Sequence, residues 1–240
     1  MVRDASRPYD DYGNNPGPDG DAYFAQLFED KFLPPFPTGV SVKYNNQTTF
    51  NPEFNITSWF QNFMVRSNDL VLFGLDWNTR KAPVKPGYED RGVGPTAQLH
   101  DFPGGTLQWL DAQLGELAAS GANFTEIVFL QHHPYTLQIY APDVIYGFSP
   151  EKKRIIQEML QERFPISAYR GVIAGHLHRF WVGEAFTEPE WASFTQWETD
   201  ACKGHEHDRV PKERWAGFSL VRVRNGRIVE VEQIQGPHTL

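Results

Sequence analysis

Cysteine is almost absent from the sequence, since Cys202 is the only one in 240 residues. A single thiol excludes an internal disulfide framework and any zinc module built from several cysteines. The sequence also has no apolar run that approaches the roughly 18 residues needed to cross a bilayer. Residues 1–15 lack the apolar core of a signal peptide, whereas glycosylation sequons at Asn46, Asn55 and Asn123 suggest secretion, so the sequence does not assign a compartment.

Positive charge is also in short supply. The chain has 22 Lys and Arg against 30 Asp and Glu, which gives a formal net charge of −8 at pH 7. This balance argues against an extended nucleic-acid surface, because neutralising phosphates requires clustered Lys and Arg. Hydrophobic residues make up 40% of the chain, which predicts a folded core, and the length suits one domain spanning residues 1–240.

Hydrophobic periodicity and turn residues divide the chain into alternating strands and helices. In chain order, we predict a loop (1–20), a helix (21–32), extended stretches (within 38–66), a buried strand (69–77), a long loop (78–105), a helix (106–120), a strand (126–131), a helix (149–165), a strand (171–174) and a hairpin (219–234). Ser149 is a typical helix cap, and Asn225-Gly226 is a typical hairpin turn. This alternation predicts a layered α/β fold with a mixed sheet.

Two histidine motifs each end one of the predicted strands. His132 and His133 precede Pro134 directly after the strand 126–131, while His176 and His178 follow the strand 171–174. A right-handed crossover through the intervening helix makes the two strands parallel and brings both strand ends to one edge of the sheet. Gly175 is expected to turn the backbone so that the alternating imidazoles face different ions. The two motifs together predict a metal site at that edge.

The order of these segments resembles the second half of the calcineurin-like metallophosphoesterases, which include purple acid phosphatases and cyclic-nucleotide phosphodiesterases. The resemblance extends over about residues 12–234 and depends mainly on "HHP" (132–134) and "GHLH" (175–178), with weaker support from the "WL" helix. It implies a layered αββα sandwich with mixed sheets, here without its N-terminal strands. It also implies a dinuclear metal centre bridged by an aspartate and a hydroxide.

The resemblance assigns ligands residue by residue. It implies that His132 and His176 bind the second metal and that His178 binds the first. The family's Gly-Asn-His-Asp/Glu motif corresponds to "GNNP" (13–16), in which Asn14 occupies the ligand position and Asn15 replaces the histidine that serves as acid. His133 is expected to be one of the neighbours that orient the ligand imidazoles.

Two acidic motifs of the family are missing from this sequence. No Asp-x-His and no Gly-Asp precede Gly13, so the chain is expected to represent the family without its N-terminal part. The remaining ligands (Asn14, His132, His176 and His178) are all neutral. Two dications without a bridging carboxylate repel strongly in a cleft of low dielectric constant. We therefore expect one tightly held ion, bound by Asn14, His132 and His176, unless Asp10 or Asp11 supplies the missing charge.

The predicted activity is metal-dependent hydrolysis of a small phosphoric ester, as a phosphatase or phosphodiesterase. Such chemistry needs a divalent ion to activate water and to neutralise phosphoryl oxygens, and imidazole ligands suit Mn, Fe or Zn. No catalytic acid is assigned. The alternative is a catalytically inactive metallophosphoesterase-like module that serves in binding or as a scaffold, which the missing carboxylates favour.

Three further polar residues are predicted to have roles other than metal binding. Asp76 follows the strand 69–77 and is expected to cap the next turn. His205 and His207 repeat the His-x-His spacing, but they lie in a polar stretch and are expected to be solvated.

Overall fold

The computed structural model describes residues 38–45, 49–53, 56–58, 60–67, 69–78, 97–121, 123–137, 147–177, 179–199 and 215–237. The predicted loop at 1–20 and the predicted helix at 21–32 lie outside these residues. Of the predicted loop at 78–105, the described residues 97–105 contain neither helix nor strand, and a single bridge joins Asn78 to Ala97.

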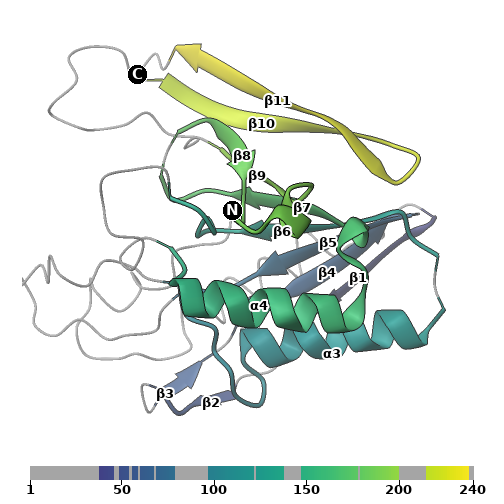
Figure 1. The fold of residues 1–240 in the computed structure, drawn as a ribbon, viewed down its shortest axis with the longest axis vertical. Helices are drawn as coiled ribbons and strands as arrows, with labels where there is room; N and C mark the ends of the chain where they lie inside the picture. The colour runs from purple at the N-terminus through teal and green to yellow at the C-terminus, as the bar shows by residue number, and fades with distance from the viewer. Residues whose placement is uncertain are drawn as a thin grey trace, which may run out of the picture.

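A mixed seven-stranded sheet lies at the centre of the described structure (Figure 1). Its strands are β1 (Val40–Tyr44), β4 (Phe63–Ser67), β5 (Leu70–Leu75), β6 (Glu126–Gln131), β7 (Tyr169–Ala174), β8 (Trp181–Glu184) and β9 (Thr195–Glu198). They are ordered β1-β4-β5-β6-β7-β9-β8 across the sheet. The four strands β5, β6, β7 and β9 are mutually parallel, and the other three pair antiparallel with their neighbours. A separate short hairpin joins β2 (Thr49–Asn51) to β3 (Ile56–Ser58).

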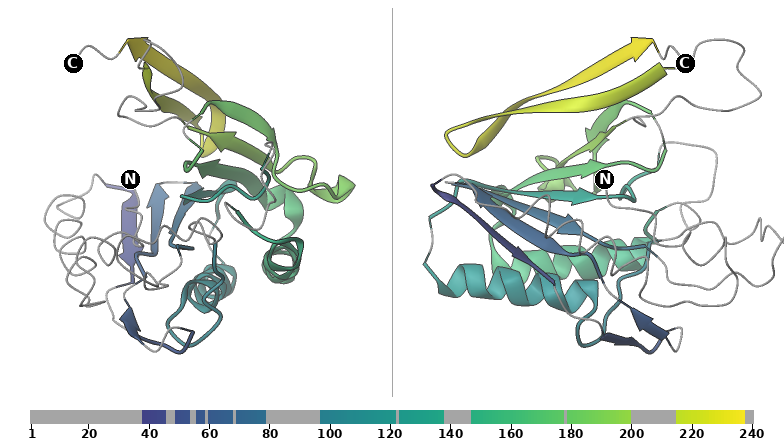
Figure 2. Two further views of the ribbon diagram at one scale, coloured as in Figure 1. Left: turned by 90° about the vertical axis from the view of Figure 1, so that its left-hand side faces the viewer. Right: turned by 180° about the vertical axis from the view of Figure 1, so that it is seen from behind.

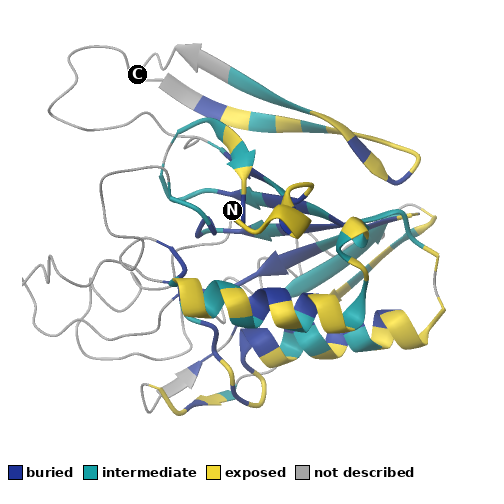
Figure 3. Ribbon diagram, in the orientation of Figure 1, coloured by how far each residue is buried: buried dark blue, intermediate teal, exposed yellow. Residues whose placement is uncertain are grey.

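Two helices cover one face of this sheet (Figure 1). Helix α3 (Thr106–Ala119) crosses from β5 to β6, and helix α4 (Pro150–Arg163) crosses from β6 to β7. The apolar stripes of both helices pack on the sheet, so the largest hydrophobic cluster joins Leu110 and Leu160 to Phe129 of β6. Colouring by burial shows the inner sides of α3 and α4 buried and their outer sides exposed (Figure 3). As predicted, the Ser149 hydroxyl accepts a hydrogen bond from the backbone N–H of Lys152 and caps α4.

A long hairpin lies over the opposite face of the sheet, away from the helices (Figure 2). It consists of β10 (Trp215–Arg224) and β11 (Arg227–Pro237), and it turns at Asn225 and Gly226. Both turn residues have positive φ, 51° and 70°, as a type I′ turn requires. Ile228 of the hairpin packs against Leu70 and Val128, which point to this face of the sheet. The predicted hairpin and its turn are therefore confirmed.

The described elements confirm the α/β fold with a mixed sheet. They form a helical layer, the seven-stranded sheet, the long β10–β11 hairpin and the short β2–β3 hairpin. The αββα sandwich implied by the resemblance stays a prediction. Among the described residues, no helix is long and apolar enough to cross a membrane.

Candidate metal centre

The two histidine motifs leave neighbouring strands at the same edge of the sheet. Strands β6 and β7 are adjacent and parallel, with Gln131 directly opposite Ala174 at their carboxyl ends. The chain continues from these ends into His132 and His133 on one side and into His176 on the other. The convergence that the sequence predicted is therefore confirmed for these three residues. It follows from the crossover through α4, which returns the chain to the next parallel strand.

Three imidazoles form a compact group at this edge. One ring nitrogen each of His132, His133 and His176 lies within 4.8 Å of the others, close enough for all three to bind one ion. Nε2 of His132 lies 2.8 Å from Nδ1 of His176. The ring centroids are 4.7 Å apart for His132 and His176 and 4.9 Å apart for His133 and His176. His133 is fully buried, and the other two are half-buried. A set of three histidine nitrogens is a known zinc-binding arrangement and also suits Fe and Mn.

One detail of the sequence prediction is extended and one needs correction. His133, which was expected to orient a neighbouring imidazole, also belongs to the group that can hold the ion. Gly175 was expected to provide the turn, but the positive φ of 71° belongs to His176, and Gly175 is not among the glycines with positive φ. A Cβ on Gly175 would meet only His132, at 3.8 Å, which is an ordinary contact. Histidine adopts positive φ more readily than most residues, so the turn does not need the glycine.

The other predicted ligands lie outside the described residues. Asn14 and His178 belong to this set, as do Asp10 and Asp11, the acids considered as substitutes. The candidate centre therefore consists of His132, His133 and His176 in the part of the chain that the structure describes. The fold and these imidazoles together define an α/β protein with a site that can hold a metal ion.

A buried glutamine at the end of β6 supports the first histidine turn. The Gln131 side-chain amide donates a 2.6 Å hydrogen bond to the carbonyl oxygen of His133, and its oxygen accepts one of 3.0 Å from Trp77 Nε1. Burial raises the pKa of the Tyr135 hydroxyl, which also lies beside Gln131, so Tyr135 is a neutral phenol near neutral pH. Gln131 was not predicted as a supporting residue, and its only signal in the sequence is a polar residue that ends an apolar run.

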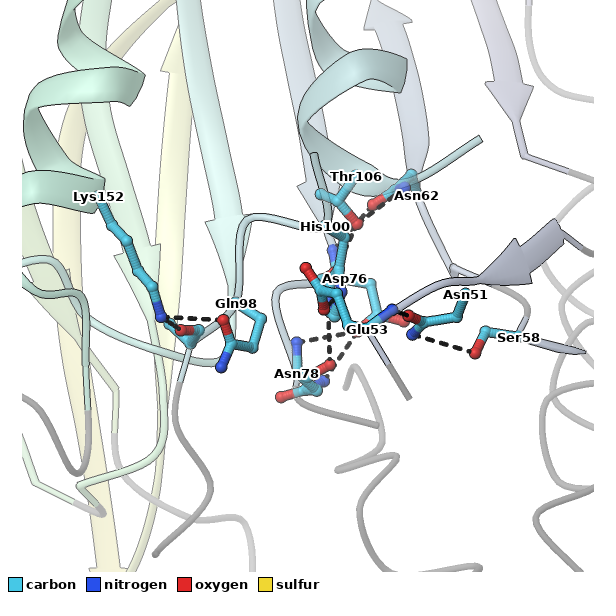
Figure 4. Close-up of polar contacts among 11 residues, drawn as sticks. Asn51, Glu53, Ser58, Asn62, Asp76, Asn78, Gln98, His100, Thr106 and Lys152 are labelled. Carbon is cyan, nitrogen blue, oxygen red and sulfur yellow. Dashed lines mark hydrogen bonds and ion pairs between the residues drawn. The ribbon is translucent and has the colours of Figure 1, made fainter. Parts of the chain in front are cut away.

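A second polar cluster lies beyond the carboxyl end of β5 (Figure 4). Asp76 is fully buried and accepts hydrogen bonds from the backbone N–H groups of Asn78, at 3.2 Å, and Gln61, at 3.1 Å. The Thr106 hydroxyl donates to the Asp76 carbonyl oxygen at 2.6 Å, which ties the start of α3 to the same point. The predicted turn cap is therefore confirmed, and Asp76 additionally joins β4, β5 and α3.

His100 belongs to the same cluster and connects two parts of the fold. Its ring is fully buried, with Nδ1 3.0 Å from Glu53 Oε2 and Nε2 2.9 Å from the Asn78 carbonyl oxygen (Figure 4). Each of the two ring nitrogens therefore has an oxygen partner at hydrogen-bonding distance. With both ring nitrogens engaged, His100 links the β2–β3 hairpin to β5.

Lys152 extends this polar region to the first turn of α4. Its ammonium donates to the carbonyl oxygen of Ala97 at 2.6 Å and to Gln98 Oε1 at 3.0 Å (Figure 4). Burial lowers the pKa of Lys152, and the nearby charge of Glu53 opposes that shift. Lys152 therefore holds the segment that leads into α3 against the start of α4.

No model of a known protein family matches the chain, and no curated protein matches it either. Assignment of a function therefore depends on the geometry of the histidine group and on the motifs that contain it.

Proposed function

We propose that this chain hydrolyses phosphoric esters with the help of a divalent metal ion held by His132, His133 and His176. The observation that supports the proposal most strongly is the convergence of three imidazole nitrogens within 4.8 Å at the ends of two adjacent parallel strands. Ligand sites of α/β sheets characteristically lie beyond the carboxyl ends of parallel strands. The order of the "HHP" and "GHLH" motifs adds the resemblance to metallophosphoesterases.

The charge of the three ligands fits this chemistry. Neutral imidazoles leave the full positive charge of a divalent ion available to an anionic phosphoryl group. When bound, such an ion would lower the pKa of a coordinated water and polarise the P–O bond. His133 is fully buried, so it would screen one side of the ion from solvent, while the half-buried His132 and His176 would leave another side accessible. One ion is favoured over two because the group contains no carboxylate.

The choice of metal and of substrate depends on the resemblance and on ligand chemistry alone. We propose Mn, Fe or Zn as the ion, because these metals accept imidazole ligands readily. The proposed substrate is a small phosphoric mono- or diester. We assign no protonating residue, since Asn15 stands where the family has its acidic histidine.

Hydrolysis of chromogenic esters tests the proposal directly. The purified chain is freed of metal with a chelator and then supplied separately with Mn²⁺, Fe²⁺ or Zn²⁺. We expect hydrolysis of p-nitrophenyl phosphate or bis-p-nitrophenyl phosphate with at least one of these metals and none after chelation. Absence of hydrolysis with all three metals, in protein shown to contain bound metal, would contradict the proposal.

That negative outcome would instead support the second candidate, a metallophosphoesterase-like module that binds without catalysis. One observation favours it. The 2.8 Å contact between His132 Nε2 and His176 Nδ1 satisfies both nitrogens without an ion. An inactive module is expected to bind metal or a phosphoester without turning the ester over.

A further inference from the structure

Strand β9 carries two polar side chains into the interior of the sheet. Gln196 and Glu198 are both fully buried, and Glu198 lies directly opposite Ala174, the last residue of β7. A buried carboxylate is costly unless it is paired and hydrogen-bonded. Their partners therefore indicate what these residues do, and the partners lie in the two turns that carry the histidines.

Gln196 holds the turn that follows His132 and His133. Its side-chain oxygen accepts hydrogen bonds from the backbone N–H groups of Tyr135, at 2.8 Å, and Thr136, at 3.0 Å. Its amide nitrogen donates to the Thr136 carbonyl oxygen at 2.8 Å. These three hydrogen bonds of one buried side chain fix the backbone within three residues of His133.

Glu198 holds the turn that follows His176. Its Oε2 accepts a 2.6 Å hydrogen bond from Arg179 Nε, and its Oε1 accepts a 3.3 Å bond from Arg179 Nη2. Its Oε1 also accepts a 2.9 Å bond from the amide of Gln196. A continuous chain of hydrogen bonds thus runs from the first histidine turn through Gln196 and Glu198 to the second turn.

We propose that Glu198 is a positioning residue for the metal centre and that, through Gln196 and Arg179, it sets the spacing of the two histidine turns. This inference depends on the proposed metal site. An ion needs its ligand nitrogens within a few tenths of an ångström of fixed positions, and residues that orient ligands contribute strongly to metal affinity. The hydrogen bonds of the Glu198 side chain go to Arg179 and Gln196, so its effect on the three histidines is transmitted through the backbone of the two turns.

Metal affinity and stability separate this role from a purely structural one. Glu198→Gln leaves Arg179 without its carboxylate and places an amide N–H beside guanidinium donors. The double variant Arg179→Met/Glu198→Leu removes both charges and fills the space with apolar groups, a change that is often neutral for stability. We expect the Kd for Zn²⁺, measured by titration calorimetry, to rise about 10- to 100-fold in both variants. We expect the Tm of the metal-free protein to fall in the single variant and to recover in the double variant.

A second bidentate ion pair of the chain provides the matched control. Arg163 donates two 2.7 Å hydrogen bonds to Asp111 between α4 and α3, and within the described residues this pair has no hydrogen bond to either histidine turn. Asp111→Asn is expected to lower Tm slightly and to leave the Kd for Zn²⁺ unchanged.

The results distinguish the positioning role from the metal site itself. A double variant that binds Zn²⁺ as tightly as the unmodified chain would overturn the positioning role while leaving the metal site intact. An unmodified chain that binds no Zn²⁺ would overturn both. If neither Glu198 variant folds, Arg179→Lys decides the question, because this side chain is 27% exposed and lysine keeps the charge without the planar fork. We expect its Kd to rise about 10-fold, and an unchanged Kd would overturn the role.

Discussion

His176→Ala is expected to lower metal-dependent hydrolysis of bis-p-nitrophenyl phosphate more than about 100-fold, because it removes one of three ligands from the ion. The free energy of unfolding of the metal-free protein is expected to fall by no more than about 2 kcal/mol. Part of that loss comes from the backbone, since alanine is less favourable than histidine at the φ of 71° that His176 adopts. Initial rates over a metal titration measure the effect on activity, and chemical denaturation measures the effect on stability.

His132→Ala is the companion variant that removes the backbone contribution. His132 is not among the residues with positive φ, so alanine fits its backbone without strain, yet the same nitrogen contact is lost. Both variants are expected to lose activity to a similar extent. Asp111→Asn, which alters a surface pair between the helices, is expected to keep full activity. Metal-dependent hydrolysis that survives His176→Ala would rule out the proposed site.

Phe129→Ala is expected to lower the free energy of unfolding by about 3–5 kcal/mol, the largest loss we predict for a side chain outside the metal centre. Phe129 lies in β6 and is fully buried, with its ring stacked 6.0 Å from both Phe73 and Tyr169 on the neighbouring strands. Alanine leaves a cavity that three rigid strands cannot close. Urea denaturation monitored by tryptophan fluorescence measures the loss.

Phe218→Ala is the matched control for that substitution. The same atoms are removed, but Phe218 lies on the hairpin and is 54% exposed. Its loss is expected to change the free energy of unfolding by no more than about 0.5 kcal/mol. Equal losses in the two variants would show that the core between the helices and the sheet does not dominate stability.

The sequence predicted well those elements whose pattern is strongly periodic. The helix predicted over 106–120 is observed as Thr106–Ala119, and the strand predicted over 126–131 has the same bounds in the structure. Both have apolar residues at the spacing of one buried face, so local pattern and tertiary packing agree. The hairpin turn was equally predictable, because Asn225-Gly226 suits positive φ at both positions.

The edge of the sheet formed by β8 and β9 was not predicted. Each strand has only four residues, and β9 reads "TQWE", in which buried polar residues interrupt any alternation of apolar side chains. Gln196 and Glu198 can be buried because turns about 60 and 19 residues away supply their hydrogen-bond partners. The local sequence around β9 does not reveal these distant partners. A single sequence therefore does not distinguish this strand from a polar loop.

The candidate site was predicted in part, and the reasons differ by residue. The approach of His132 to His176 follows from strand order and crossover handedness, which are general rules. The presence of the His133 imidazole in the group that can hold the ion was not predicted. Strand alternation fixes side-chain direction only within a strand, and β6 ends at Gln131. Asn14 and His178 lie outside the described residues, so their assignment stays a prediction.

Metal content after dialysis tests the central claim that the three histidines hold one ion. The purified chain is loaded with Zn²⁺ or Mn²⁺, dialysed against metal-free buffer and assayed by elemental analysis. About one equivalent per chain is expected, lost in His132→Ala and His176→Ala and little changed in His178→Ala. Two equivalents per chain would mean that carboxylates such as Asp10 or Asp11 complete a dinuclear centre. One equivalent that persists in His132→Ala and His176→Ala would place the ion elsewhere and contradict the account.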